Sequence, residues 1–393
     1  MAAQPAAILL LLASGSWLLA SDKSNIHMMT SQQRGFFMNT TNLVGASLEE
    51  IEAAMGAMSE PRYRARQIYA GIYRRLLHSW DEFTDLGRRL REKLNEQFKI
   101  ENPRVQQVFV SRDGTRRYLF DVGPGQRVES VFIPEERRDT FCISTQVGCA
   151  VGCLFCVTGR LRMRRNLLPG EIVGQVLALQ SDRGTVSRRL NIVIMGMGEP
   201  LNNYENVMKS IGLMTDEQGM CISPRRVTLS TSGIVPGIRR LAEEPVLPNL
   251  AISLNATTNA VRDLLIPINK KWNIETLLAT CRNFPLAHRR RITFEYVLIE
   301  GLNDSIEDAL RLVRLLEGLR KKVNLIPLNA DPWIPLKTPS QERILGFQQV
   351  LVEHHITVNI RRPRGDDVSA ACGMLAGREQ ARGDSIHPPD RRS

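Results

Sequence analysis

The sequence predicts an α/β protein whose main part is a β/α barrel, preceded by a small helical domain and a β-hairpin. Three observations lead to this prediction. From about residue 139, short β-rich runs alternate with helical segments. Residues 47–98 follow a helical period throughout. Between these regions, two strand-like runs flank an Asp-Gly turn.

Composition places the chain among ordinary globular proteins. Its 393 residues are 43% hydrophobic and 24% charged, enough for one large domain and a smaller one. The formal net charge of +11 favours a polyanionic partner, because Lys and Arg side chains that neutralise phosphates release counterions. A merely basic enzyme is the alternative that charge alone leaves open.

The chain opens with the apolar run "AAILLLLASGSWLLA", which is too short to span a bilayer and is similar in length to the apolar part of a signal peptide. No Lys or Arg precedes it, and the first basic residue is Lys23. We therefore expect residues 1–37 to be a non-native or disordered extension, with Met28, Met29 and Met38 as candidate starts. Export is the alternative. The expected location is the cytoplasm, without a membrane segment.

Residues 38–100 predict a helical domain. "SLEEIEAAMGAM" begins with a capping box formed by Ser47 and Glu50, and the next two segments, "PRYRARQIYAGIYRRLL" and "FTDLGRRLREKLNEQF", keep the helical period. A surface that contacts RNA and a solvated charged face are both open interpretations of its many arginines. These are Arg62, Arg64, Arg66, Arg74, Arg75, Arg88, Arg89 and Arg91.

Residues 101–138 predict a β-hairpin linker, because "VQQVFVSRDGTRRYLFDV" turns at Asp113-Gly114. Residues 139–365 then predict repeated βα units. Parallel strands need crossover helices, so this region is an open doubly wound sheet or a full or partial β/α barrel. We favour the barrel because polar or Gly-rich residues follow several strands, where barrel enzymes place their sites. The strand-like runs are "TFCIST", "NIVIMG", "RVTLSTS", "LAISLN", "ITFEYVLI", "VNLIPLN" and "ITVNIR".

Three cysteines lie close together just after the first predicted barrel strand. Cys149, Cys153 and Cys156 have the spacing CxxxCxxC, and no fourth Cys or His lies nearby to complete a zinc site. Three thiolates on a 4Fe–4S cluster leave one iron free to bind a cofactor or substrate. The odd total of seven cysteines at irregular spacing also argues against a secreted disulfide framework.

This motif resembles that of the radical S-adenosylmethionine (SAM) superfamily. The resemblance implies a partial β/α barrel, SAM bound to the open iron, and its reductive cleavage to a 5′-deoxyadenosyl radical. Further segments resemble the radical enzymes that methylate adenine C2 in 23S rRNA and, in some members, in tRNA. They are "VESVFIPE", "CISTQVGCAVGCLFC", "MGMGEPLNN", "RRVTLSTSG", "AISLNA", "NLIPLN" and "RGDDVSAACGML".

The resemblance implies roles for individual residues. Cys149, Cys153 and Cys156 match the cluster ligands. Asn255 departs from the family, which usually has His there; because Asn also donates and accepts hydrogen bonds, we expect cofactor binding to survive. The positions that match SAM contacts are Gly198, Glu199, Ser230, Ser253, Leu254, Asn255 and Asn329.

Adenine C2 lies between two ring nitrogens and is a poor nucleophile, so a carbon radical suits the reaction better than polar attack on a sulfonium. By resemblance, Cys372 carries a methyl group that becomes a methylene bridge to the base, and Cys142 releases the product by forming a disulfide. Glu129 matches the proposed proton acceptor. Residues 366–393 are expected to form the loop that carries the catalytic Cys372, followed by a disordered basic tail. Cys221 and Cys281 match no role and are expected to be packing residues.

The resemblance also implies binding partners, and it leaves two alternative functions to consider. We expect 23S rRNA and tRNA as substrates, flavodoxin or ferredoxin as electron donor, and a monomer. Arg160, Arg162, Arg164 and Arg165 are candidates to receive the RNA backbone, and the runs at 288–291 and 361–364 could line the same path or be solvated. One rival is the related branch that methylates adenine C8 and confers antibiotic resistance. The other is a cluster-bearing RNA-binding or sensor protein, which would have no need for Cys372, Cys142 and Glu129 together.

Overall fold

The computed structural model describes residues 40–184, 189–329, 331–332 and 334–375. The apolar run near the start and the basic tail after residue 375 lie outside the described residues. No helix in the described ranges is long and apolar enough to cross a membrane.

The predicted N-terminal helices are confirmed. They are α1 (Leu48–Ala57), α2 (Arg62–Tyr73) and α3 (Arg88–Gln97), with the short helix η1 (Trp80–Glu82) and a small parallel pair, β1 (Thr41–Asn42) and β2 (Phe98–Lys99). The capping box forms as expected, because the Ser47 amide donates to Glu50 Oε2 at 2.8 Å and the Glu50 amide donates to Ser47 Oγ at 3.3 Å.

The predicted hairpin is present and is part of a larger sheet. Strands β3 (Arg104–Val110) and β4 (Arg116–Asp121) pair antiparallel around the Asp113-Gly114 turn, and β4 pairs with a third strand, β5 (Arg127–Pro134). β5 in turn pairs antiparallel with the first barrel strand, β6 (Arg138–Cys142). The segment that we predicted as a linker is therefore hydrogen bonded to the barrel along its edge.

The partial barrel is confirmed, because seven parallel strands follow one another in the order β6-β9-β10-β11-β12-β13-β14. Within the described residues β14 does not pair with β6, so the barrel stays open. The strands after β6 are β9 (Arg189–Ile194), β10 (Val227–Thr231), β11 (Asn249–Ser253), β12 (Ile292–Leu298), β13 (Lys321–Pro327) and β14 (Val358–Ile360).

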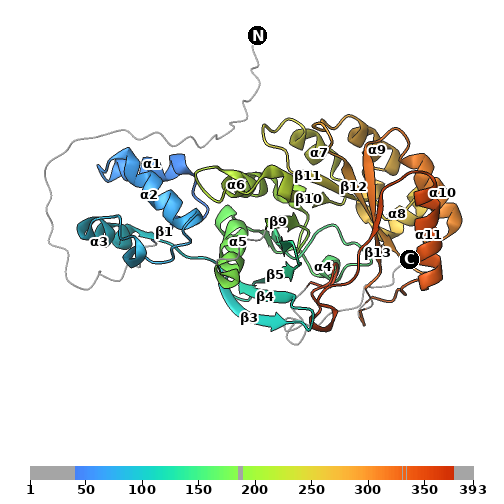
Figure 1. Cartoon of the computed structure of the whole chain (residues 1–393), viewed down its shortest axis with the longest axis horizontal. Coiled ribbons are helices and arrows are strands. Elements are labelled where there is room, and N and C mark those ends of the chain that lie inside the picture. Colours follow the sequence, from blue (N-terminus) through green and yellow to red (C-terminus); the bar gives the residue numbers. More distant parts are fainter. Residues whose placement is uncertain (1–39, 185–188, 330, 333, 376–393) are drawn as a thin grey trace, which may run out of the picture. The chain divides into compact units, whose positions relative to one another are not determined.

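Helices cover the outside of the parallel strands (Figure 1). Helices cover the outer face and the curved sheet encloses the inner face, so its central strands are buried on both sides, and every residue of β12 is buried. The helices are α5 (Pro169–Arg183), α6 (Tyr204–Thr215), α7 (Val235–Leu241), α8 (Asn259–Leu265), α9 (Ile274–Arg282), α10 (Ile306–Leu315) and α11 (Gln341–Glu353). The short elements η2 (Pro200–Asn203), η3 (Pro224–Arg226), η4 (Pro267–Lys270) and η5 (Asp366–Val368) lie in the connections.

Candidate active site

A pocket opens at the carboxyl ends of the parallel strands and brings together the predicted cluster ligands and Cys372 from the far end of the chain. We call it the cysteine pocket. Parallel strands place their carboxyl ends at one rim, which is why residues distant in sequence meet there. Its lining includes Cys149, Cys153, Cys156, Gly198, Glu199, Ser230, Ser253, Asn255, Glu295, Asn329, Arg361 and Cys372.

The cluster loop runs from β7 (Gln146–Val147) to the short helix α4 (Val157–Arg160). Backbone amides of Val151 and Gly152 face the sulfur of Cys149. Burial raises the pKa of the Cys149 thiol to about 12, and burial together with the charges of the other two sulfurs raises the pKa of Cys153 well above its usual value. Three thiolates packed this closely repel one another, so the loop needs a bound cation to hold them deprotonated.

The chemistry of this donor set, three cysteine sulfurs on one loop, fits an iron–sulfur cluster. Thiolates that receive backbone N–H bonds are typical cluster ligands. Within the described ranges, no group of three or more His, Cys, Asp or Glu side chains is placed to hold one metal ion. A cluster separates its protein ligands more widely than a single zinc ion does, because each thiolate binds a different iron atom.

Replacing any one of Cys149, Cys153 and Cys156 by Ala should therefore remove the iron. We expect anaerobically purified protein to be brown with about four irons per chain, and each variant to be nearly colourless. Iron analysis and the visible absorption spectrum measure this. Cys221→Ala, an exposed cysteine outside the pocket, is the matched control and should keep its iron. Activity retained in a preparation that contains zinc and no iron would contradict the cluster assignment.

In the segment after β9, the backbone at Gly198 lies directly against the side chain of Gln146. Gly198 has a φ of +103°, and a Cβ there would lie 2.6 Å from Cβ of Gln146, so only Gly fits. Glu199 is buried, and its Oε2 accepts from the Ser232 amide at 2.7 Å and from Ser232 Oγ at 2.8 Å. Burial raises the pKa of Glu199 and these hydrogen bonds oppose the rise. The carboxylate thus ties the end of β9 to the end of β10 at the pocket rim.

Asn255 occupies a left-handed backbone position just after the end of β11. Its φ of +54° lies in the left-handed region that Asn tolerates better than most residues. Its Oδ1 accepts from the Val297 amide at 2.8 Å, and its carbonyl accepts from Asn303 Nδ2 at 2.7 Å. Asn255 therefore joins β11 to β12 while lining the pocket. Leu254, by contrast, does not line the pocket, since its side chain is buried in the core.

The loop that carries Cys372 is bonded directly to the cluster loop and to β13. The Val157 amide donates to the Gly373 carbonyl at 2.8 Å, and Asn329 Nδ2 donates to the Cys372 carbonyl at 3.0 Å. Asn329, predicted as a cofactor contact, thus also positions Cys372. The side chain of Cys372 is accessible.

Cys142 ends strand β6 beside this loop. Burial, and then the charge of Cys372, raise the pKa of the Cys142 thiol to about 12, which places the two sulfurs within electrostatic range of each other. All seven cysteines lie in the described ranges and all are free, so the disulfide that we expected is not formed.

Glu129 is not in the cysteine pocket. It is fully buried on β5 and forms an ion pair with Arg117. Arg117 Nε also donates to the Val368 carbonyl at 2.7 Å, in the turn just before Cys372. The hairpin tip holds the same turn, because Ser111 Oγ donates to Asp367 Oδ1 at 2.6 Å. The hairpin therefore positions the loop of Cys372, a role that its sequence did not indicate.

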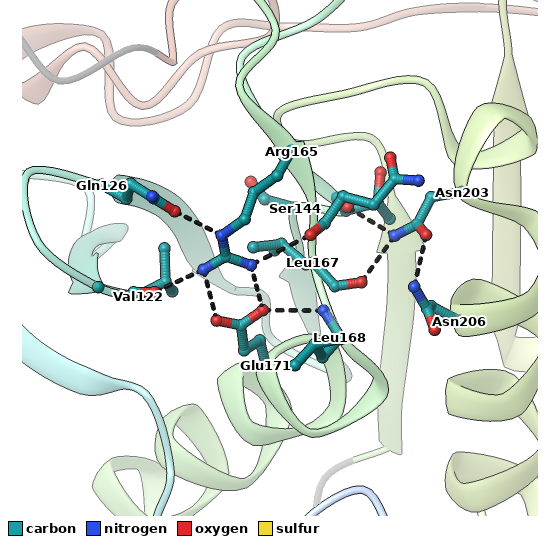
Figure 2. Close-up of polar contacts among 12 residues, drawn as sticks. Val122, Gln126, Ser144, Arg165, Leu167, Leu168, Glu171, Asn203 and Asn206 are labelled. Atoms are coloured by element: carbon teal, nitrogen blue, oxygen red, sulfur yellow. Dashed lines mark hydrogen bonds and ion pairs between the residues drawn. The ribbon is translucent and has the colours of Figure 1, made fainter.

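Arg165 is bonded to groups of the protein itself. Arg165, in β8 (Arg165–Asn166), forms a bidentate ion pair with Glu171, with both N–O distances at 2.7 Å, and also bonds Gln126 (Figure 2). Nearby, Asn203 Nδ2 donates to the carbonyls of Thr145 and Leu167, both at 2.9 Å. These contacts close the base of the cluster loop. Arg160, Arg162 and Arg164 are exposed and Arg165 is partly exposed, and the proposed contact of all four with RNA stays a prediction.

Sequence reasoning missed Glu295 and Arg262 at the site, and it offered Arg361 only as part of a run that could line the path of the RNA. Glu295 and Arg361 line the pocket, and Arg262 is fully buried below its rim. Burial by itself lowers the pKa of Arg361. The charges of the neighbouring Cys372 and Glu295 outweigh this effect, so the pKa of Arg361 is raised overall. Glu295 had a signal, since a Glu in the middle of an otherwise apolar central strand is rarely without a function.

The comparisons with known proteins agree with this geometry. The family model of the radical SAM superfamily matches residues 143–313, and that of the ribosomal RNA large subunit methyltransferase N-terminal domain matches residues 41–100. The crystal structure of a radical SAM methyltransferase from Sphaerobacter thermophilus superposes with a TM-score of 0.81 at 44% identity, covering 85% of this chain and 99% of that one. The fold and the site thus define a radical SAM enzyme.

Among curated proteins, the dual-specificity RNA methyltransferase RlmN of Syntrophus aciditrophicus (strain SB) is 49% identical over 341 residues, which cover 87% of this chain and 98% of the relative. RlmN of Geobacter sulfurreducens is 48% identical over 340 residues, covering 86% and 93%. The chain belongs to the RlmN family of dual-specificity RNA methyltransferases.

Proposed function

We propose that the protein is a radical SAM methyltransferase that methylates C2 of a specific adenine in 23S rRNA and in tRNA. The observation that carries the proposal is the meeting of Cys372 with the three cysteines of the cluster loop in one pocket. A cluster-binding sensor without turnover would need no accessible thiol there. When bound, the cluster and SAM supply a methyl group and, from a second SAM, a 5′-deoxyadenosyl radical.

The residues of this chain then handle the methyl group. Cys372 carries it as a thioether, and after one hydrogen atom is removed, its carbon radical bonds to adenine C2. The adduct then loses one electron, which the bound cluster would accept, and the C2 proton, which leaves a closed-shell thioether between Cys372 and the base. The sulfur of Cys142 next attacks the sulfur of Cys372, so that an S–S bond forms and the S–CH2 bond breaks. The electron pair of that bond passes to the carbon, which takes up a proton and becomes the methyl group. A thiol reductant must open the disulfide before the next turnover.

Glu129 is proposed to accept the proton that leaves C2. Its ion pair with Arg117 must open for this, since the carboxylate lies outside the cysteine pocket. Arg117 bonds both Glu129 and the turn before Cys372, so movement of that turn is the change that would free the carboxylate. The electron donor is proposed to be a flavodoxin or ferredoxin.

The test is a product analysis. We expect reconstituted enzyme with SAM and a reductant to form 2-methyladenosine in 23S rRNA and in tRNA transcripts, and Cys372→Ala to form none. Liquid chromatography with mass spectrometry of the digested nucleosides separates the C2 from the C8 isomer, which have equal mass. Finding 8-methyladenosine alone would place the protein in the C8 branch, and an unmodified tRNA would restrict the substrate to rRNA.

A further inference from the structure

A second cavity lies at the opposite, amino-terminal end of the barrel strands. We call it the basic chamber. Its walls come from the start of β11 at Asn249, the start of β13 at Lys322, and the connections that lead into β10 and β12. These positions are the far ends of the strands whose carboxyl ends form the cysteine pocket. The six cations that line it are Arg225, Arg289, Arg290, Arg291, Lys322 and Arg361.

The charge of the basic chamber is almost entirely of one sign. Glu295 is the acid among the residues that line it, against six cations and the imidazole of His288. In the described part of the chain, none of the six forms an ion pair. Arg290 donates to the Leu247 carbonyl at 2.6 Å and Arg291 to Thr357 Oγ1 at 2.8 Å, whereas Arg225 and Arg289 make no side-chain hydrogen bond there.

The close packing of six cations in the basic chamber is electrostatically unfavourable in the free protein. Burial lowers the pKa of Lys322, and the charges of Arg291 and Arg361 lower it further, while Glu295 opposes the shift. The pKa of Arg290 is lowered by burial and by Arg225. Arg289 adds backbone strain, because its φ of +64° is uncommon for a residue that is not Gly. A bound polyanion would relieve the repulsion between these groups.

The basic chamber adjoins the catalytic site. Met195, Glu295 and Arg361 line both the basic chamber and the cysteine pocket. Arg361 is therefore near Cys372 on one side and near the crowded cations on the other. A nucleoside whose phosphates lie on the cations would have its base directed along the barrel interior toward Cys372.

We propose that the basic chamber binds the phosphates that flank the target adenosine, and that the base reaches Cys372 through the interior of the partial barrel. The proposal rests on the proposed RNA substrate. An acidic electron-transfer protein is the other polyanion to consider. A concave chamber that shares Met195, Glu295 and Arg361 with the active-site pocket favours a strand of RNA, since a nucleotide bound there lies next to the site where its base must react.

The test removes the two cations that have no other hydrogen-bonding role. Arg225→Gln combined with Arg289→Gln should weaken binding of a labelled 23S rRNA fragment by about tenfold or more in moderate salt. For two lost contacts to a single strand, the slope of log K against log salt should become shallower by about 1.4. Methylation of Cys372 and RNA-free cleavage of SAM should be unchanged, because both occur in the cysteine pocket.

The matched control removes the same charge elsewhere. Arg239→Gln combined with Arg314→Gln alters two exposed residues, on α7 and α10, and should leave affinity and salt slope near those of the wild type. Equal effects of the two double variants would overturn the proposal, since net charge alone would then explain them. Normal RNA binding with loss of flavodoxin-driven but not dithionite-driven turnover would assign the basic chamber to the electron donor. If wild-type enzyme neither binds nor methylates RNA, the proposed function itself fails.

Discussion

Replacing Cys142 by Ala should leave the enzyme covalently joined to its RNA. The variant keeps Cys372, so it can still form the methylene bridge to adenine, but it lacks the sulfur that breaks that bridge. Multiple turnover should fall to at most one RNA per chain. Cys372→Ala, in contrast, should give neither product nor adduct, because the carrier of the methyl group is lost.

A denaturing gel with labelled RNA separates the adduct from tight binding. A thioether survives heat and denaturant, whereas contacts to phosphate dissociate in high salt. Nuclease digestion should leave an adenosine-containing fragment on the peptide around Cys372. Cys221→Ala and Cys281→Ala are the controls, since Cys221 is exposed outside the pocket and Cys281 is buried in α9. Normal turnover by Cys142→Ala without an adduct, or a crosslink at another cysteine, would refute these sulfur roles.

Local patterns in the sequence predicted the elements well because each element carries its own signal. The capping box at Ser47 and Glu50 and the turn at Asp113-Gly114 formed as expected. The seven barrel strands also matched, since runs of buried residues are typical of parallel strands. The domain boundaries stay predictions.

Contacts between distant segments were harder to predict, because no local pattern reports them. Ser111 and Asp367 are hydrogen bonded although the whole barrel region separates them in the sequence. The role of the hairpin in holding the Cys372 loop could therefore not be predicted from the sequence. The partners of Arg165 could not be predicted for the same reason. Its place in a run of arginines suggested RNA, and the sequence did not indicate that Glu171 and Gln126 would bond its guanidinium.

Arg262 supplies the last prediction, and its burial makes the expected effect large. It is 0% exposed, and its guanidinium donates to the Ser232 carbonyl at 2.7 Å and to the Leu254 carbonyl at 3.0 Å. It also bonds the Ser253 carbonyl at 3.1 Å and Asn269 Oδ1 at 3.0 Å. One side chain thus fixes the carboxyl ends of β10 and β11, which form the rim of the cysteine pocket.

Arg262→Gln should lower the free energy of unfolding by about 3–5 kcal/mol, because each buried carbonyl left without a donor costs about 1–3 kcal/mol. Because Ser232 and Ser253 lie at the rim, we also expect SAM to bind at least about tenfold more weakly, a change of about 1.4 kcal/mol in binding free energy. Arg262→Lys should be intermediate, since one ammonium cannot reach all the acceptors. Arg282→Gln, which removes an exposed arginine with a single 3.3 Å bond to the Leu315 carbonyl, is the matched control. Denaturant titration and SAM calorimetry measure both effects, and a stable Arg262→Gln variant with unchanged SAM affinity would show that the rim holds its shape without this side chain.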